Sequence, residues 1–514
     1  MEFSAYHNSH DLFFRNPFGA VTCGQKIVFR LGTCSDISIE GCYLRLWEGD
    51  KEKILPMNKK IITDNELASF SEAERCCPEI KVSFEKVSFE VEYRTADEPG
   101  LVWYYFIIPV DSKTYYFGNN PARAGGVGKL WEQEPPAYQV TVHLPMKVPQ
   151  WYKKGVMYQI FVDRFYNGNE NGSILRPRKK SLIHSDWYDT PFYIKDGQGR
   201  VIRWNFFGGN LKGVLKKLPY LKELGVSIIY FNPIFDSSSN HKYDTADYLH
   251  IDPMYGDESD FELLVKESAK QGISIILDGV FSHTGSDSIY FNKYGNYPGL
   301  GGYQSPDSPY FKWYKFKENP DKYKCWWGVE DLPEVDEMEP SYRQFIYGAE
   351  NSVIKKWMQL GVKGWRLDVA DELPDEFIKE LRQAMKQTEP DSVLIGEVWE
   401  DASNKISYGK SREYLWGEEL DSTMNYPFRE IFLQFILGDL DAQIVDKKVM
   451  SLYENYPRES FYAAMNLIGS HDRARILTLL GEAPPEEEMS IAERESFSLS
   501  AAARNLAVQR LKLL

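Results

Sequence analysis

The pattern of hydrophobic and polar residues changes near residue 150 of the 514-residue chain. Before that point, short runs rich in β-branched and aromatic residues alternate with Gly, Pro, Asp and Asn. These runs cover residues 26–31, 42–47, 82–91 and 102–108. Short strands separated by turn residues are typical of a β-sandwich. We therefore predict an N-terminal β-sandwich over residues 1–145, followed by a proline-bounded linker at residues 145–149.

From residue 151 onward, apolar strands alternate with amphipathic helices. The predicted strands cover residues 156–161, 227–232, 273–278, 364–370 and 393–397, with weaker candidates at 422–425 and 461–468. The predicted helices cover residues 211–225, 260–271, 352–360 and 374–387. This alternation implies an α/β fold with a parallel sheet, and seven strands fit a TIM (β/α)8-type barrel better than a doubly wound sheet. We expect this domain to cover residues 151–514, with a long excursion at residues 283–350 after the third strand.

The pattern predicts no eighth strand. Residues 510–514 continue a predicted helix. A barrel that stops before its eighth strand has two unpaired strand edges and an open core. We therefore expect a barrel truncated before the eighth strand, with low stability and weak activity.

The net charge limits the classes of partner that we expect, and the cysteine content indicates the cellular compartment. Lys and Arg total 60 and Asp and Glu 75, so the formal net charge is −15. An acidic chain is repelled by nucleic acids and anionic membranes, so we expect neither as a partner. The six cysteines show no Cys-x-x-Cys spacing, which is typical of free thiols in a reducing compartment. Without a visible signal peptide or an apolar run of about 18 residues, the expected location is cytoplasmic.

Acids, histidines and an arginine stand at four predicted strand ends. They are Asp278, His283, Arg366, Asp368, Glu397, His471 and Asp472. Barrel enzymes hold their catalytic groups at the carboxyl ends of the strands. Solvated loop acids would explain any one of these residues, but not polar groups at four strand ends together. Arg366 and Asp368 lie two residues apart and point to the same face of a strand, so we expect Asp368 to stay ionised.

These segments resemble the hallmark regions of a known family. Residues 278–283, 364–372, 396–399 and 469–472 are similar to the four regions of the α-amylase superfamily, glycoside hydrolase family thirteen. Residues 230–235 and 239–248 resemble the neopullulanase, cyclomaltodextrinase and maltogenic amylase group. Members of that group carry a starch-binding-like β-sandwich before the barrel, which the N-terminal region resembles.

The resemblance implies three catalytic acids. Asp368 matches the nucleophile, Glu397 the general acid/base, and Asp472 the acid that grips the distorted sugar. Retaining hydrolysis needs one ionised and one protonated carboxyl group. The apolar neighbours of Glu397 in the sequence are expected to raise its pKa.

The resemblance also implies residues that bind the substrate. Tyr243 matches the tyrosine beneath the sugar ring at the cleavage site, and His283 and His471 match the histidines that bind its hydroxyls. Arg366 matches the arginine that keeps the nucleophile ionised. Trp399 is a further candidate for substrate contact because it lies two residues after the proposed acid.

A calcium ion is the one cofactor that the resemblance suggests, and no organic cofactor is expected. The group often has an Asn/Asp-rich calcium loop after the first strand, where this chain has Asn167, Asn169, Gly208 and Asn210 and Asp is largely replaced by Asn. Calcium prefers charged oxygen ligands, so an Asn/Gly turn is the alternative interpretation. Ser282 replaces the asparagine that binds calcium in many members, so the sequence makes that second site doubtful.

The resemblance implies a retaining hydrolase that cuts α-1,4 links in maltodextrins, cyclodextrins or pullulan through a covalent glycosyl-enzyme. One alternative is a 4-α-glucanotransferase that uses the same acids. A second alternative is a non-catalytic carbohydrate-binding protein, although such relatives typically lose catalytic acids that this chain retains. The expected partner is an α-glucan, and a homodimer formed through the N-terminal domain is a further hypothesis.

Overall fold

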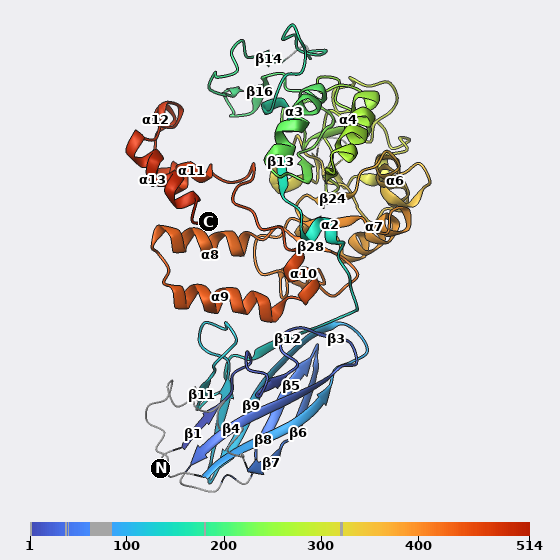
Figure 1. Ribbon diagram of the computed structural model, residues 1–514. Coiled ribbons are helices and arrows are strands. Elements are labelled where there is room, and N and C mark those ends of the chain that lie inside the picture. The colour runs from blue at the N-terminus through green and yellow to red at the C-terminus, as the bar shows by residue number, and fades with distance from the viewer. Residues whose placement is uncertain (1–2, 36–38, 40, 62–84, 179–180, 319–321) are drawn as a thin grey trace.

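The computed structural model describes residues 3–35, 39, 41–61, 85–178, 181–318 and 322–514. Strands β1 to β12 form a β-domain, which lies at the bottom of Figure 1. The chain from α2 onward forms an α/β-domain above it. In the part of the chain that the structure describes, no helix is both long and apolar enough to cross a bilayer.

The β-domain consists of two sheets that share one hydrophobic core. The first sheet contains β1 (Phe3–Tyr6), β2 (Arg15–Asn16), β4 (Lys26–Ser35), β7 (Asn58–Ile61) and β8 (Glu85–Arg94). The second contains β3 (Val21–Thr22), β5 (Tyr43–Glu48), β6 (Lys51–Pro56), β9 (Gly100–Val110), β10 (Lys113–Gly118), β11 (Lys129–Trp131) and β12 (Tyr138–His143). Alternate residues of β4 and β9, such as Phe29 and Phe106, are fully buried between the sheets. The predicted strands are confirmed, except that residues 82–84 lie outside the described residues.

The α/β-domain is built on a curled parallel sheet of six strands in chain order. They are β13 (Met157–Ile160), β18 (Ile228–Phe231), β21 (Ser274–Gly279), β24 (Gly364–Leu367), β25 (Val393–Gly396) and β28 (Ser422–Thr423). Its crossover helices are α3 (Leu211–Glu223), α4 (Glu258–Lys270), α6 (Val353–Gln359) and α7 (Asp375–Thr388). Because each strand pairs with its predecessor, the sheet forms a half-barrel, as expected for the first part of a barrel.

Shorter elements fill the loops and the C-terminal part. The strands are β14 (Leu182–Ile183), β15 (Ile194–Lys195), β16 (Val201–Arg203), β17 (Asn205–Phe206), β19 (Phe235–Ser237), β20 (Thr245–Ile251), β22 (Phe316–Glu318), β23 (Lys322–Tyr323), β26 (Ile406–Ser407) and β27 (Lys410–Ser411). The α-helices are α2 (Gln150–Lys153), α5 (Pro340–Arg343), α8 (Tyr426–Leu437), α9 (Ala442–Asn455), α10 (Arg458–Ala463), α11 (Ile476–Leu480), α12 (Ile491–Ser496) and α13 (Ala501–Leu511). Single turns of 3₁₀ or π helix are η1 (Val162–Arg164), η2 (Phe311–Trp313), η3 (Trp326–Gly328), η4 (Gln344–Gly348), η5 (Ala370–Glu372) and η6 (Glu486–Glu488).

The seventh predicted strand, residues 461–468, is wrong. Its first residues belong to helix α10, which begins directly after Pro457. Proline presets a helical start, and the Arg, Glu and Ala residues that follow are good helix formers. Among the described residues, a single parallel bridge, between Met424 and Met465, continues the sheet beyond β28.

The chain crosses the open side of this half-barrel after that bridge. Met465 pairs with Met424 next to β28, which is one edge of the sheet. Nδ1 of His471 lies 2.8 Å from Nε2 of Gln159 on β13, which is the opposite edge. Residues 465–471 therefore connect the two edges of the sheet and bring the following residue, Asp472, to its mouth.

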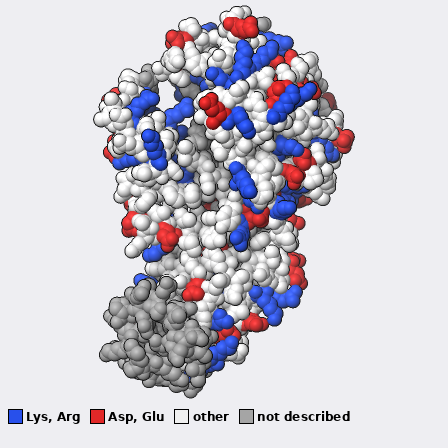
Figure 2. All heavy atoms as spheres, viewed as in Figure 1, with Lys and Arg blue, Asp and Glu red and all other residues white. Residues whose placement is uncertain are grey.

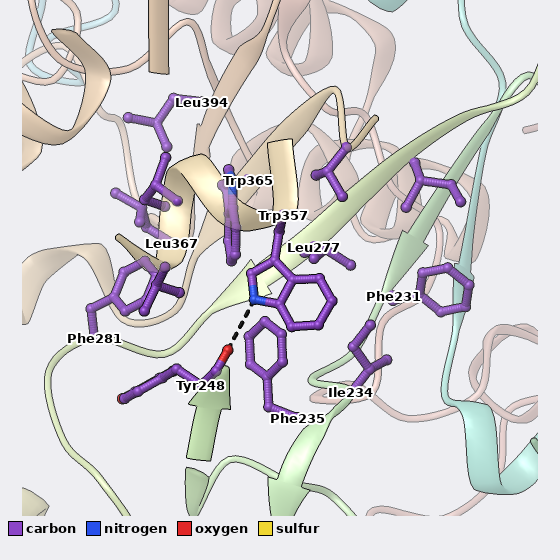
Figure 3. Close-up of a cluster of buried hydrophobic side chains, with 14 of the residues drawn as sticks. Phe231, Ile234, Phe235, Tyr248, Leu277, Phe281, Trp357, Trp365, Leu367 and Leu394 are labelled. Carbon is purple, nitrogen blue, oxygen red and sulfur yellow. Dashed lines mark hydrogen bonds between the residues drawn. The ribbon is translucent and has the colours of Figure 1, made fainter. Parts of the chain in front are cut away.

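Trp357 of helix α6 anchors the helices to the sheet. Its side chain is fully buried, and Nε1 donates a 2.9 Å hydrogen bond to the carbonyl oxygen of Tyr248 (Figure 3). Phe235 lies 5.1 Å away between ring centroids, and Phe261 meets the indole edge-on at 5.4 Å. Burying a large aromatic ring while satisfying its N–H makes this contact a strong contributor to the core.

The β-domain is joined to helix α9 by buried polar contacts. Glu454 has only 2% of its side chain exposed and pairs with Arg15 at 2.5 Å and with His10 at 2.9 Å. The hydroxyl of Thr141 donates a 2.6 Å hydrogen bond to the carbonyl oxygen of Asn455. A buried charge pair is costly to break, so these contacts hold the two domains in one arrangement.

Candidate active site

Neighbouring parallel strands bring three carboxylates to one edge of the sheet. Asp278 belongs to the carboxyl end of β21, Asp368 directly follows β24, and Glu397 directly follows β25. The register pairs Asp278 with Arg366. Since parallel strands in register end at the same level, residues more than a hundred positions apart in the chain become neighbours.

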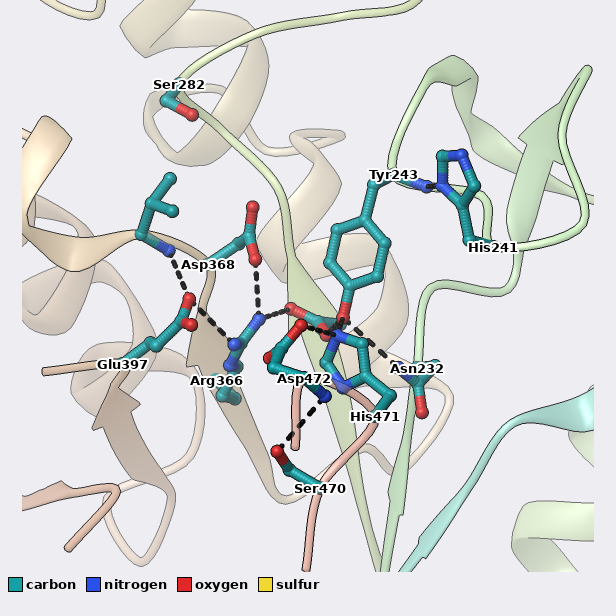
Figure 4. Close-up of polar contacts among 12 residues, drawn as sticks. Asn232, His241, Tyr243, Ser282, Arg366, Asp368, Glu397, Ser470, His471 and Asp472 are labelled. Atoms are coloured by element: carbon teal, nitrogen blue, oxygen red, sulfur yellow. Dashed lines mark hydrogen bonds and ion pairs between the residues drawn. The ribbon is translucent and has the colours of Figure 1, made fainter. Parts of the chain in front are cut away.

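Arg366 lies among these three acids. Its side chain is buried, and Nη1 donates hydrogen bonds of 2.9 Å to Asp278 and 2.8 Å to Asp368 (Figure 4). Nη2 lies 2.8 Å from Oε2 of Glu397, as an ion pair without the alignment of a hydrogen bond. One guanidinium thus fixes the positions of both proposed catalytic acids.

The pKa of Asp368 is shifted in the direction opposite to the one expected from the sequence. Burial raises the pKa of Asp368 well above its usual range, the guanidinium of Arg366 opposes this, and the charges of Glu397 and Asp278 reinforce it. The direction of this pKa shift runs against the expectation that Arg366 keeps Asp368 ionised. One cation is shared by three buried carboxylates, so its charge offsets only part of the burial cost at Asp368.

Glu397 is held by two N–H groups. The backbone N–H of Val369 donates to Oε2 at 2.8 Å, and Nε1 of Trp399 donates to Oε1 at 3.1 Å. The indole of Trp399 stacks on Tyr426 with ring centroids 4.1 Å apart, and the guanidinium of Arg473 lies 4.3 Å from the same indole. Trp399 therefore orients the acid, and its contact with substrate stays a prediction.

A chain of hydrogen bonds runs from Asp278 to the crossing segment. The hydroxyl of Tyr243 donates to Oδ2 of Asp278 at 2.8 Å and accepts from Nδ2 of Asn232 at 3.1 Å. Nε2 of His471 lies 2.8 Å from the same hydroxyl, and the two rings stack 5.2 Å apart. Because Nδ1 accepts from the amide of Gln159, His471 carries its proton on Nε2.

Both histidines at the mouth are neutral. Burial lowers the pKa of His471 to about 3, and the charge of Arg366 adds to the effect. Burial lowers the pKa of His283 to about 4. Nε2 of His283 donates to the carbonyl oxygen of Tyr243 at 3.1 Å, and Nδ1 accepts from the hydroxyl of Ser282 at 3.0 Å. His283 thus positions the backbone of Tyr243 through Nε2, while Nδ1 is engaged by Ser282, and its contact with a sugar hydroxyl stays a prediction.

Asp472 is the least enclosed of the proposed acids. About a third of its side chain is exposed, and Oδ1 lies 3.2 Å from Nε2 of His471. Burial raises the pKa of Asp472 to about 6, and the charge of Glu397 contributes. Its position depends on the crossing segment, because residues 470–475 form no strand that would pair with the sheet.

The proposed calcium loop is an asparagine turn network. Oδ1 of Asn167 accepts hydrogen bonds from Asn210 Nδ2 at 3.1 Å and from the N–H of Asn169 at 2.9 Å. Oδ1 of Asn210 accepts from the N–H groups of Gly168 and Gly213 and caps helix α3. The N–H of Gly208 donates to Asp163. These oxygens are engaged by N–H donors, so the residues do not fit a calcium cage.

Groups of His, Cys, Asp and Glu side chains also provide no metal site in the described part of the chain. Among the residues that the structure describes, no group of three His, Cys, Asp or Glu side chains is arranged to hold a metal ion.

Several contributors to the site had no assigned role in the sequence interpretation. They are Gln159, Tyr230, Asn232 and Asp278, and all lie at or beside carboxyl ends of strands. Tyr230 donates to Oδ2 of Asp278 at 2.6 Å. All four lie within the last three residues of predicted strands, a signal that drew attention to Asp278 and could have found the other three.

Comparisons with known proteins point to one family. Residues 159–499 match the family model described as alpha amylase, catalytic domain. An amylopullulanase of Thermoanaerobacterium thermosulfurigenes is 40% identical over 99% of this chain and 27% of its own length. Neopullulanase 2 of Thermoactinomyces vulgaris is 37% identical over 65% of this chain and 52% of its own. The type III pullulan hydrolase of Thermococcus kodakarensis superposes with a TM-score of 0.59 at 26% identity, over 99% of this chain and 78% of that one.

The chain spans less than half the length of the curated amylopullulanases that it matches. Three of them are matched over 27%, 40% and 35% of their length.

Proposed function

The chain belongs to the α-amylase family of glycoside hydrolases, and on that basis we propose that it cleaves α-1,4-glucosidic bonds of α-glucans with retention of configuration. The observation that carries the proposal is the shared guanidinium: Arg366 lies 2.8 Å from both Asp368 and Glu397. Retaining hydrolysis needs two carboxyl groups on opposite sides of the same bond, one ionised and one protonated. One cation between the two carboxyl groups favours ionising one of them, and their like charges disfavour ionising both.

Asp368 acts as the nucleophile in this proposal. Its carboxylate attacks the anomeric carbon while Glu397 donates a proton to the departing glycosidic oxygen, which gives a glycosyl-enzyme ester. Glu397 then removes a proton from water, which attacks the anomeric carbon and releases Asp368. The hydrogen bonds from Val369 and Trp399 hold Glu397 in place for both steps.

The substrate in this proposal is a neutral glucan such as maltodextrin, cyclodextrin or pullulan. Several relatives are named amylopullulanase or neopullulanase, which favours including pullulan. The visible face in Figure 2 mixes basic and acidic side chains, which suits an uncharged substrate better than a charged polymer.

Reducing-sugar release from these three glucans tests the proposal. We expect Asp368→Asn to lose turnover while circular dichroism and the unfolding midpoint remain those of a folded protein. Asp391→Asn, at an exposed turn, is the matched control and should retain turnover. Unchanged turnover in Asp368→Asn would contradict the assignment.

Product analysis separates hydrolysis from transfer by the same acids. Maltotriose should yield maltose and glucose. Products longer than maltotriose would assign glucanotransferase activity instead, because a sugar hydroxyl would then have replaced water. Glucan binding without any cleavage would assign a non-catalytic role.

A further inference from the structure

Two arginine side chains lie close together where the crossing segment packs against the start of helix α8. Arg429 follows Tyr426, the first residue of α8, by three positions, so both side chains lie on one face of the helix. Nε of Arg429 donates a 3.3 Å hydrogen bond to the carbonyl oxygen of Ile468 in the crossing segment. The guanidinium of Arg473, directly after that segment, lies 5.6 Å from the ring centroid of Tyr426.

One end of the Arg429 guanidinium has no acceptor in the protein. Only 6% of the residue is exposed, and Nη2 is buried without a hydrogen-bond partner among the described residues. The next residue, Glu430, is exposed and accepts a hydrogen bond from Gln434 instead. Burying a charge without a counter-ion is costly, and a buried donor that lacks a partner calls for an explanation such as a bound ion. We therefore looked for what surrounds this guanidinium.

The surroundings of Arg429 are positively charged. Neither Arg429 nor Arg473 forms an ion pair with an Asp or Glu side chain in the described ranges. Asp472 precedes Arg473, but its Oδ1 lies 3.2 Å from Nε2 of His471. The first turn of α8 contains no acidic residue, and the free N–H groups at a helix start carry partial positive charge. Burial lowers the pKa of Arg429, and the charge of Arg473 adds to the effect.

We propose that Arg429 and Arg473 together bind a phosphate group at the junction of helix α8 and the crossing segment. A guanidinium presents its N–H donors as a planar fork that matches two oxygens of a phosphate, and the charge of a phosphate offsets that of two guanidinium groups. Chloride has no pair of oxygens to match the fork, so it should bind more weakly. Free phosphate and the phosphate ester of a sugar present the same group to the two arginines.

The proposed ligand lies beside the catalytic machinery without belonging to it. The guanidinium of Arg473 lies 4.3 Å from the indole of Trp399, whose Nε1 donates to Glu397. A phosphate held by both arginines therefore fixes Arg473 and, with it, the part of the chain that carries Asp472. Binding of the phosphate requires neither a glucan nor turnover, so this proposal and the proposed function can fail separately.

Calorimetric titration of the full chain with sodium phosphate tests the proposal. About 0.1 M sodium chloride screens unspecific attraction beyond about 10 Å, and one phosphate site per chain should remain. Arg473→Met and Arg429→Met should each weaken this site about tenfold or more, because each removes charged hydrogen-bond donors. Arg475→Met is the matched control: it removes the same charge two residues after Arg473 and should bind phosphate as the parent does.

A parallel titration with glucose 6-phosphate separates the two sources of the phosphate group. Tighter binding of glucose 6-phosphate supports the proposal with a sugar phosphate as the ligand, and tighter binding of inorganic phosphate supports it with the free ion. Binding of neither compound, or a signal that disappears in sodium chloride, would overturn it.

Thermal unfolding distinguishes a ligand site from a purely structural role of Arg429. Phosphate should raise the unfolding midpoint of the parent, because it binds the native state, and should not raise that of Arg429→Met. Without phosphate the midpoint of this variant should not fall, because the substitution removes a buried charge that has no counter-ion. If Arg429→Met does not fold, the exposed Arg473 still decides the outcome. Phosphate binding by Arg473→Met that equals the parent's would overturn the site.

Discussion

The backbone N–H of Val369 donates a 2.8 Å hydrogen bond to Oε2 of Glu397, and it does so from a left-handed backbone conformation. Val369 has φ 40° and ψ 59°. A β-branched residue rarely adopts this conformation, which costs about 1–3 kcal/mol. Val369, the residue after the proposed nucleophile, thus has a strained backbone conformation that directs its N–H toward Glu397, the proposed acid.

This relationship predicts a small effect for one substitution of Val369 and a large loss for another. Val369→Gly keeps the N–H and relieves the strained backbone, so turnover should stay within a few-fold and the free energy of unfolding within about 1 kcal/mol. Val369→Pro removes the donor and cannot adopt a positive φ, so it should lower both turnover and stability, the latter by about 3 kcal/mol or more. Urea unfolding and reducing-sugar assays measure the two quantities. A proline variant as active as the parent would show that the hydrogen bond is dispensable.

Arg366 is expected to be the most costly ion-pair residue to replace at the site. Arg366→Met leaves Asp278, Asp368 and Glu397 buried without a cation, so the free energy of unfolding should fall by about 3–5 kcal/mol at pH 8. The loss should be smaller at pH 5, because the carboxyl groups then escape their burial cost by taking up protons.

The matched control for Arg366→Met is Arg343→Met. Arg343 pairs with Glu380 at 3.0 Å, with 26% and 37% of the two side chains exposed. Breaking this partly exposed pair should cost about 1 kcal/mol or less at either pH. Equal losses in the two variants would argue against a buried charge cluster.

Asp472 should make stability depend on pH in one window. Burial raises its pKa from the usual 3.8 to about 6, so the native state binds this proton more tightly than the unfolded chain does. The free energy of unfolding contributed by this group therefore falls as the pH rises from about 3.8 to 6. The asparagine in Asp472→Asn cannot take up a proton in this range, so the variant does not lose this free energy. The difference in the free energy of unfolding, variant minus parent, should therefore rise between pH about 3.8 and 6 and stay constant above pH 6. Denaturant unfolding at pH 4, 5, 6 and 7 measures the difference, and parallel pH profiles would refute the shifted pKa.

Removing calcium should leave the protein unchanged. The oxygens of Asn167 and Asn210 accept hydrogen bonds from N–H groups, and no carboxylate belongs to the proposed set. We expect the unfolding midpoint to be the same in EDTA and in millimolar calcium chloride. Calcium that binds the native state would raise the free energy of unfolding by about 2.7 kcal/mol when its free concentration is 100 times the Kd. The comparison of midpoints detects such a change easily. A calcium-dependent midpoint that is lost in Asn167→Ala would establish the site.

Local patterns in the sequence predicted most of the framework. Buried strands β13, β18, β21, β24 and β25 were evident as apolar runs, and helices α3, α4, α6 and α7 as amphipathic segments. The proposed acids were recognised because carboxyl ends of strands follow from the same runs. These predictions use local information, because the spacing of apolar residues and the position of turn residues are properties of neighbouring positions in the chain.

The tertiary structure decided what depends on distant partners. Residues 461–468 have strand-like composition, yet the proline before them starts a helix and only Met465 reaches the sheet. The segment that ends at His471 closes the open side through Gln159, a residue 312 positions away. Arg366 appeared in the sequence as the partner of one acid, and folding made it the partner of three. The sequence alone determined which residues are proposed to carry the chemistry. Only the folded chain decided how they share charge, because a pKa reflects all the charges and the burial around a group.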